Sequence, residues 1–192
     1  MAINGIEMIT DRSQSDIVIA KSLFRKGFNG MTDAEKSAFL AGLRGAYNYT
    51  DFNRVESAVE YLSKRLYNIP SEIEALAEQL GVAPDSLLMA GFEGEKYADV
   101  EVKTDWTAND YLTGNDRNRY LQNLLLILSG FQDTSKIPTT LSGLTYLGAN
   151  NIEKSLEGLN SYLINLQETK ETLINKTSKA WFFSGELFGG ET

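Results

Sequence analysis

The 192-residue sequence contains no cysteine and no histidine. The lack of cysteine excludes disulfides and thiol nucleophiles, and the lack of both residues excludes zinc sites built from thiolate and imidazole ligands. Catalytic triads and acid–base schemes that depend on imidazole are excluded as well. Any catalysis would have to use carboxylates, lysine or tyrosine, and we predict no catalytic residue, no cofactor and no metal site.

Basic residues are few, and long apolar runs are absent. The chain has 18 Lys and Arg against 26 Asp and Glu, a net charge of −8, and its longest basic cluster is the pair Arg25-Lys26. Binding to nucleic acid needs clustered basic residues. A membrane span needs about 18 consecutive apolar residues, and the first residues lack the basic start and apolar core of a signal peptide. We therefore predict no nucleic-acid or membrane partner, and we expect the chain to stay in the cytoplasm or to be assembled into a particle there.

Proline is also scarce, with three residues, and helical periodicity dominates the sequence. A capping-box pattern at residues 32–35 predicts the start of one helix. Apolar residues at helical spacing follow Thr50, which we predict as the cap of a second helix. A further box at 71–74 predicts a third helix, which Pro70 would separate from the second. With 42% hydrophobic residues, the chain should bury a real core.

Residues 91–103 interrupt the helical pattern. Two glycines, mixed charges and the alternation of Val100 and Val102 predict a linker with one edge strand. We therefore divide the chain into an N-terminal helical module at 1–90, the linker at 91–103, and a C-terminal helical module at 104–192.

The chain repeats itself across this boundary. TDRSQSDIV from Thr10 aligns with TDWTANDYL from Thr104, and TDFNRVESAV aligns with NDRNRYLQNL. Asp16 and Asp51 are 35 positions apart but Asp110 and Asp116 only 6, so the first copy carries 29 additional residues, predicted as a helical hairpin around Ser22–Tyr47. The matched pairs are Thr10/Thr104, Asp11/Asp105, Ser13/Thr107, Asp16/Asp110, Asp51/Asp116, Asn53/Asn118 and Arg54/Arg119.

A third, partial copy lies in TYLGANNIEKSLEGL. The matched pairs are Tyr146/Tyr49, Asn150/Asn53, Ile152/Val55, Glu153/Glu56, Leu156/Val59 and Leu159/Leu62. One device that starts a helix is thus used three times.

Three aspartates surround the tryptophan of the second copy: Asp105, Asp110 and Asp116. Their spacing does not give the alternating ligands, the central glycine and the glutamate at the twelfth position that a calcium loop requires. A carboxylate in the first turn of a helix meets unpaired N–H groups and the positive end of the helix dipole. We therefore predict that Asp116, like Asp51 in the first copy, stabilises a helix start.

The last long helix, predicted at residues 149–179, has a heptad pattern. Such a helix forms a coiled coil between copies or packs within its own bundle, and both interpretations remain open. The apolar residues of the tail WFFSGELFGGET predict a small hairpin or strand that docks on a partner or folds back. The heptad positions are Ile152, Leu159, Leu166, Leu173 and Ala180, with Leu156 and Leu163 on the complementary seam. The candidate interaction residues are Trp106, Leu159, Leu163, Leu166, Leu173, Trp181, Phe182, Phe183, Leu187 and Phe188.

The pattern T-x-W-x-x-x-D followed by D-x-N-R-[IV]-E-x-x-[IV]-x-Y-L resembles a module of minor structural, tail and fibre proteins of phages and prophages of Gram-positive bacteria. Here it reads TDWTANDYLTGNDRNRYLQNL and YTDFNRVESAVEYL, and GLTYLGANNIEKSLEGL and WFFSGELFGG resemble further segments of those proteins. The chain departs from the pattern in the insertion and in Tyr120-Leu121, where the family has an aliphatic residue and Glu.

The resemblance implies a non-enzymatic, self-associating virion protein that connects or decorates the tail, baseplate or fibre and contacts other phage structural proteins. One alternative is a carboxylate-based cell-wall hydrolase carried by the tail, which needs two acids facing one cleft roughly 5–10 Å apart. Another is a soluble chaperone or adaptor used during assembly. For the fold we predict a mainly α-helical bundle of repeated loop–helix modules, with minor β structure in the linker and the C-terminal tail.

Overall fold

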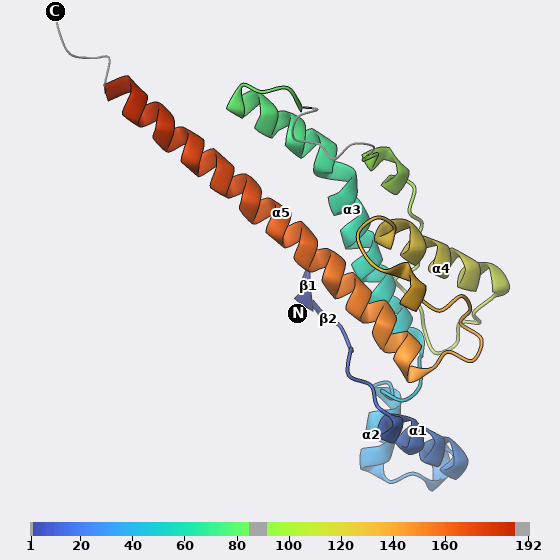
Figure 1. The fold of residues 1–192 in the computed structure, drawn as a ribbon. Coiled ribbons are helices and arrows are strands. Elements are labelled where there is room, and N and C mark those ends of the chain that lie inside the picture. The colour runs from blue at the N-terminus through green and yellow to red at the C-terminus, as the bar shows by residue number, and fades with distance from the viewer. Residues whose placement is uncertain (1, 85–91, 187–192) are drawn as a thin grey trace, which may run out of the picture.

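The computed structural model describes residues 2–84 and 92–186, with side chains described as far as residue 176. It confirms a mainly helical fold with a long C-terminal helix (Figure 1). The helices are α1 (Gln14–Lys26), α2 (Asp33–Leu40), α3 (Tyr49–Leu80), α4 (Gly114–Leu128) and α5 (Tyr146–Glu186). The short 3₁₀ helices are η1 (Phe28–Gly30), η3 (Gly94–Tyr97) and η4 (Thr134–Lys136).

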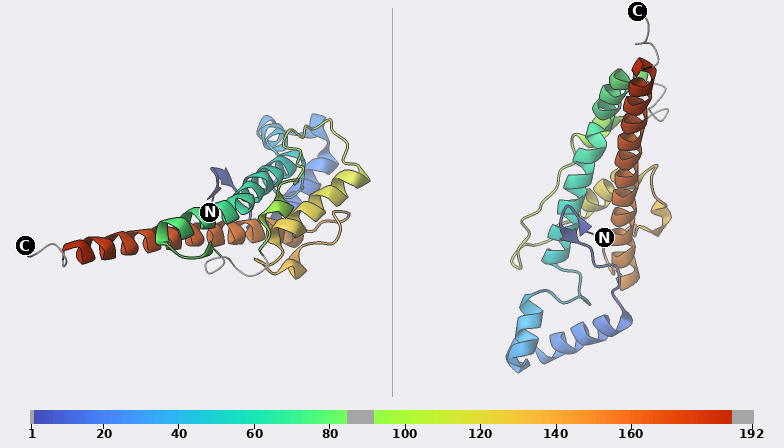
Figure 2. Two further views of the ribbon diagram at one scale, coloured as in Figure 1. Left: turned by 90° about the horizontal axis from the view of Figure 1, so that it is seen from above. Right: turned by 90° about the vertical axis from the view of Figure 1, so that its left-hand side faces the viewer.

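Helices α3 and α5 lie side by side and run in the same direction, and α4 packs against both (Figures 1 and 2). The parallel direction follows from three polar contacts whose partners stay 98–102 residues apart along both helices. These contacts are Arg54–Glu153, Arg65–Gln167 and Glu72–Lys170.

At each of three equivalent positions of the repeat, α3, α4 and α5 each contribute one residue to the core. Every one of these side chains is buried, and all belong to a single hydrophobic cluster. The inward face of each helix is therefore set by the repeated pattern, and the chain on both sides of residues 91–103 shares one core. The equivalent buried sets are Val55/Tyr120/Ile152, Val59/Leu124/Leu156 and Leu62/Ile127/Leu159.

The edge strand predicted at residues 91–103 is not formed. Residues 92–103, all described, contain η3 and extended chain, and the partly buried Val100 and Val102 pack on the core without pairing in a sheet. Their alternation reflects one-sided burial of an isolated segment. The sheet of the described chain is instead a small antiparallel hairpin of β1 (Ala2–Ile3) and β2 (Ile6–Glu7) at the N-terminus.

Helix α3 continues through Pro70, where the sequence predicted a break. The Ser71 hydroxyl donates to the Asn68 carbonyl at 2.9 Å and forms no capping box. A proline inside a helix removes one hydrogen bond, and buried side chains on both sides of it, Leu66 and Ile73, keep the helix packed across that position. The helix also begins with Asn48 as its cap, rather than Thr50.

Helix α5 starts three residues before the predicted Ala149 and extends through residues 181–186. The first half of the tail is thus helical instead of a hairpin or strand, because the helix continues through Ser184-Gly185. Residues 187–192 lie outside the described chain.

The insertion in the first copy contains two helices, α1 and α2, but α1 begins at Gln14, eight residues before the predicted hairpin at Ser22–Tyr47. We call residues 14–47 the arm; it projects from the end of the bundle where α3 and α5 begin (Figures 1 and 2). Its interior is small, with Ala20, Leu23 and Met31 buried. The arm rejoins the bundle through a close contact, since a Cβ atom at Gly45 would lie 2.0 Å from the Asp16 carbonyl oxygen.

Substitution of Gly45 by alanine should loosen the base of the arm. The added methyl would overlap the backbone of Asp16, and overpacking of this kind costs about 1–3 kcal/mol. Gly30→Ala is the matched control, because the nearest atom to its added carbon is Lys26 Cβ at 3.7 Å. Urea unfolding of both variants checks this; equal midpoints would contradict the contact.

Candidate functional site

The extended segment at residues 103–106 docks on the first turns of α3. The Asn53 side-chain amide donates to the Trp106 carbonyl at 2.8 Å and accepts from the Trp106 N–H at 2.7 Å. The buried Glu56 carboxylate accepts from the Lys103 N–H at 2.6 Å and from the Trp106 indole at 3.0 Å. Arg119 of α4 binds the same carboxylate at 2.9 and 3.2 Å. We call this group of residues the Asn53 clamp.

The segment at residues 9–12 docks on α5 with the same hydrogen bonds. The Asn150 amide donates to the Arg12 carbonyl at 2.9 Å and accepts from the Arg12 N–H at 3.0 Å. Glu153 accepts from the Ile9 N–H at 2.5 Å and from the Arg12 guanidinium at 2.7 Å. Arg54 of α3 binds both oxygens of Glu153 at 2.9 Å. We call this group the Asn150 clamp.

The two clamps confirm the internal repeat and show how it works. Each extended segment docks on the helix of another copy of the repeat. The helix that belongs to the same copy as the segment supplies an arginine, which binds the glutamate of the helix on which the segment docks. A third clamp of this kind would pair a glutamate on α4 with an arginine on α5. Instead, α4 has the buried Leu121 at the glutamate position, and α5 has Asn151 at the arginine position. Asn118, the third asparagine, is exposed.

The Asn150 clamp buries four charged side chains together. Arg12, Asp51 and Glu153 are 2%, 3% and 0% exposed, and Arg54 is 13% exposed. The Arg12 guanidinium lies 2.7 Å from each acid, and Arg54 also contacts both. Two positive and two negative charges balance, which is the condition for burying such groups without a large loss of stability.

Burial opposes the charge of Arg54, but its hydrogen bonds to Glu153 and the negative charges of Glu153 and Asp51 outweigh this effect and raise the pKa of Arg54. Arg54 therefore keeps its positive charge. The hydroxyls of Tyr47 and Tyr120 hydrogen-bond to each other nearby, and burial raises the pKa of both phenols.

The geometry of the clamps suits holding rather than catalysis. The carboxylates of Asp51 and Glu153 are buried and already bound by two guanidinium groups, so a substrate does not reach them in this structure. These two acids are thus not the acid pair that a hydrolase would need. In the part of the chain that the structure describes, no group of three acidic side chains is placed to hold a metal ion.

The aspartates around Trp106 lie at separate positions. Asp116 accepts from the Thr113 N–H at 3.0 Å in the capping box of α4, and Asp51 holds the equivalent place in α3, so both predicted helix starts are confirmed. Asp110 accepts from the Thr107 N–H at 2.7 Å and lies 3.3 Å from the Lys103 ammonium. Asp105 is exposed.

The capping box of α4 should weaken in acid. Hydrogen bonds from the Thr113 hydroxyl and N–H lower the pKa of Asp116. A carboxyl whose folded pKa is depressed stabilises the fold above its unfolded pKa, about 4, and loses this contribution as the pH falls through the folded pKa. The urea-midpoint difference between the parent and Asp116→Asn should be largest at neutral pH and shrink below about pH 4. Asp105→Asn is the exposed control; a difference that persists in acid would contradict the expectation.

The predicted interaction residues fall into three groups. Trp106, Leu159 and Leu163 are buried in the core of this chain, so they build its fold rather than a surface. Leu166 and Leu173 line a cleft between α3 and α5. The aromatic residues of the tail divide at the end of α5: Trp181, Phe182 and Phe183 lie on the helix, in its part without described side chains, and Leu187 and Phe188 lie outside the described residues.

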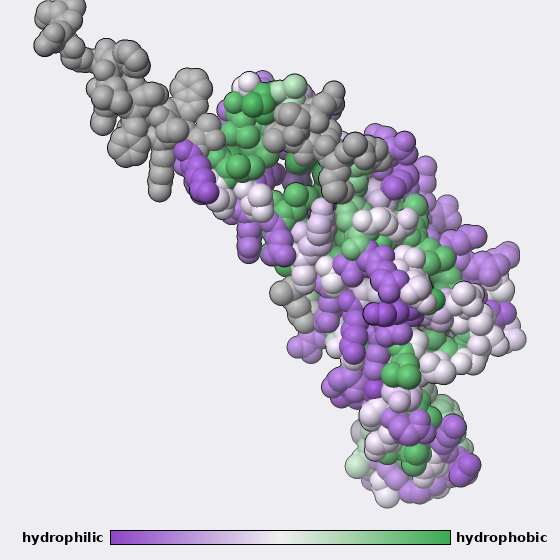
Figure 3. Space-filling view, in the orientation of Figure 1, coloured by the Kyte–Doolittle hydropathy of each residue, from purple (hydrophilic) through white to green (hydrophobic). Residues whose placement is uncertain are grey.

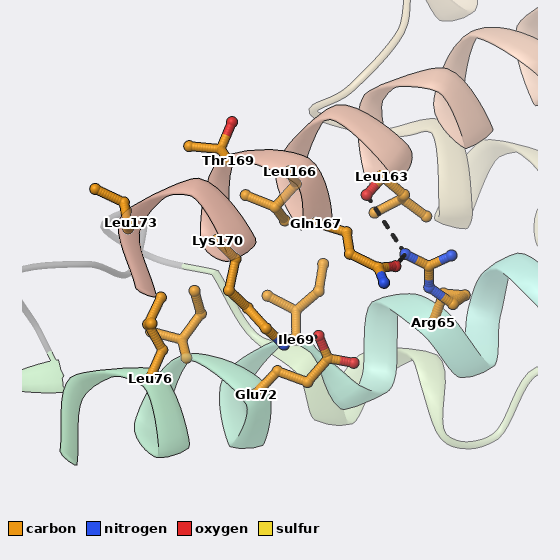
Figure 4. A pocket seen from close by; sticks show the side chains of 11 residues that line it. Arg65, Ile69, Glu72, Leu76, Leu163, Leu166, Gln167, Thr169, Lys170 and Leu173 are labelled. Atoms are coloured by element: carbon orange, nitrogen blue, oxygen red, sulfur yellow. Dashed lines mark hydrogen bonds and ion pairs between the residues drawn. The ribbon is translucent and has the colours of Figure 1, made fainter. Parts of the chain in front are cut away.

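The cleft has a volume of about 150 Å³ and opens between the second halves of α3 and α5 (Figure 4). Its walls are apolar, with Ile69 and Leu76 from α3 facing Leu166 and Leu173 from α5. Polar contacts cross it: Lys170 binds Glu72 at 3.0 Å, and Arg65 reaches the Leu163 carbonyl at 3.4 Å. Leu173 remains 39% exposed. We call this feature the α3–α5 cleft.

Sequence reasoning found the matched positions of the clamps but not their partners. Glu56 and Glu153 align in the repeat, yet each accepts one backbone N–H from a segment 47 or 144 residues away, and its other partners are side chains of distant residues. The only available signal was a glutamate on the inward side of an otherwise apolar helix face, which is unusual without a buried partner.

Comparisons with known proteins leave the family of the chain open. No family model matches the sequence, no curated protein matches it, and no solved structure matches its fold. None of the helices in the described chain combines the length and apolar character needed to cross a membrane.

Proposed function

We propose that this chain is a non-enzymatic structural component of a phage particle, which connects or decorates the tail, baseplate or fibre through helical self-association. It would be assembled in the bacterial cytoplasm and reside in the virion, in contact with other phage structural proteins. The observation that carries the proposal is the use made of the phage-like motif: Asn53, Arg54, Glu56 and Trp106 all bind other parts of the same chain.

Because the residues of this motif bind other parts of the same chain, they build a rigid scaffold. The clamps fix the N-terminal segment and the segment before α4 to helices far away in sequence, with buried, charge-assisted hydrogen bonds. Two outward features remain on this scaffold, the arm at one end and the second half of α5 at the other (Figure 1). A rigid body with projecting helical ends suits a connector between neighbouring subunits.

The proposal is tested in the particles made by cells that encode this chain. Mass spectrometry of purified particles should detect the chain at a fixed ratio to the major tail proteins, and antibody labelling should place it at the tail, baseplate or fibre. A chain found in assembling but not in finished particles would instead support the soluble chaperone. A chain absent from both would contradict a structural role in the virion.

A further inference from the structure

We propose that copies of this chain associate head to tail, with the tip of the arm of one copy bound in the α3–α5 cleft of the next. The tip is the turn of the arm, residues 24–28. This inference rests on the proposed self-association and names the two surfaces that perform it.

The tip presents aromatic side chains and positive charge together. Phe24 ends α1 and is 58% exposed, and Phe28 in η1 is 46% exposed. Arg25 and Lys26 lie between them, and Lys26 pairs with Glu35 of α2 at 2.6 Å. Large exposed aromatic side chains next to arginine are typical of the residues that contribute most to protein interfaces. Hydrophobic residues of the arm are visible at the surface at the bottom of Figure 3.

The arm is an insertion in the first copy of the repeat, and the second copy forms its helix without it. The second copy of the repeat passes from Asp110 to Asp116 in six positions, whereas the first inserts the α1–α2 hairpin between the equivalent Asp16 and Asp51. Within the core cluster the arm is represented by Tyr47, its last residue, which packs against the cluster and hydrogen-bonds to Tyr120. An insertion with exposed aromatic residues therefore suggests a role outside the fold.

The α3–α5 cleft is complementary to the tip in size and surface. A volume of about 150 Å³ suits an inserted side chain rather than a helix. Its walls are apolar, as an aromatic ring requires, and Figure 3 shows hydrophobic residues gathered at the end of α3 beside α5. Helix α4, the third member of the bundle, ends at Leu128, and among the described residues the cleft is lined by α3 and α5.

Charge favours a second copy as the occupant. The arm, residues 14–47, has five basic and three acidic residues, a net charge of +2, whereas the rest of the chain carries −10 to give the total of −8. The cleft itself is lined by Arg65, Glu72 and Lys170, with Lys170 paired to Glu72, and Glu74 and Glu78 lie on the same half of α3. A basic arm is thus drawn to an acidic body of its own kind.

The two surfaces lie at opposite ends of the molecule (Figure 1). An interface between different surfaces is heterologous, so it generates rings when the rotation closes and filaments when it does not. Head-to-tail association therefore extends beyond two copies, whereas a two-fold pair of α5 coiled coils would stop at a dimer.

The test mixes two variants of the full chain. Phe24→Ser combined with Phe28→Ser removes the tip, and Leu173→Arg places a positive charge at the cleft without disturbing the buried core. Light scattering over a range of concentrations should show concentration-dependent assembly of the parent. Each variant alone should associate at least about tenfold more weakly, as expected for the loss of an interface anchor. An equimolar mixture should form a heterodimer, because it contains one intact tip and one intact cleft.

Val18→Ser is the matched control, because Val18 is 57% exposed on the same arm but lies in the first half of α1, before the tip; it should assemble like the parent. Assembly that survives in both the tip and the cleft variants, or a parent that stays monomeric, would overturn the head-to-tail contact. Neither result depends on whether mass spectrometry finds the chain in particles, so this inference and the proposed function fail separately.

Discussion

Replacing Glu153 by glutamine is expected to lower the free energy of unfolding by about 3–5 kcal/mol, the usual cost of breaking a buried ion pair by removing one partner. The carboxylate is fully buried and is shared by Arg12 and Arg54. Without it, two buried arginines face the single charge of Asp51. Glutamine has nearly the same volume, so the loss reports charge rather than packing.

Urea unfolding followed by circular dichroism measures this loss. Amide hydrogen exchange should also speed up at Ile9, whose N–H donates to Glu153. Glu168→Gln is the control, since Glu168 is exposed on the same helix, and it should change stability by less than about 0.5 kcal/mol. Glu56→Gln should cost less than Glu153→Gln, because it strands only Arg119, which is 23% exposed and already reaches water. Equal stability of Glu153→Gln and its control would show that the clamp does not hold the fold.

The second large effect concerns the heptad pattern of α5. Leu159→Ala should destabilise the fold by about 2–5 kcal/mol, the range for truncating a fully buried leucine, because Leu159 is 0% exposed among residues of α3 and α4. Leu173→Ala, two heptads further along the same seam, should cost about 1 kcal/mol or less, because that side chain is already 39% exposed.

Thermal unfolding and light scattering of these two variants distinguish an effect on the stability of the fold from an effect on association between copies. The Leu159 variant should lose stability, and the Leu173 variant should keep its stability while its assembly weakens. The opposite pattern would mean that the first half of the seam, rather than the second, forms the surface between copies.

Much of the fold follows from local patterns in the sequence. Ser13, Thr32 and Thr113 each precede an acid three positions on, and each caps a helix. These boxes are predictable because their hydrogen bonds join residues within one turn. The equivalent apolar positions of the repeat likewise lie on the buried faces of α3, α4 and α5, since such positions at helical spacing share one side of a helix.

Other features depended on distant partners. Pro70 does not end α3, because the tertiary packing of Leu66 and Ile73 outweighs the local effect of one missing hydrogen bond. Val100 and Val102 alternate like a strand, but within residues 2–84 and 92–186 no strand is placed to pair with them.

The clamps show the division most clearly. Composition excluded cysteine and histidine chemistry, and the repeated pattern specified three related helix starts, because both depend only on residue type and short spacing. Which copy docks on which helix is decided by the tertiary structure: segments 9–12 and 103–106 find their asparagine and glutamate 138–144 and 47–53 residues away. The physical reason is that buried charges need partners, and only the folded chain brings the partners of Glu56 and Glu153 within hydrogen-bonding distance.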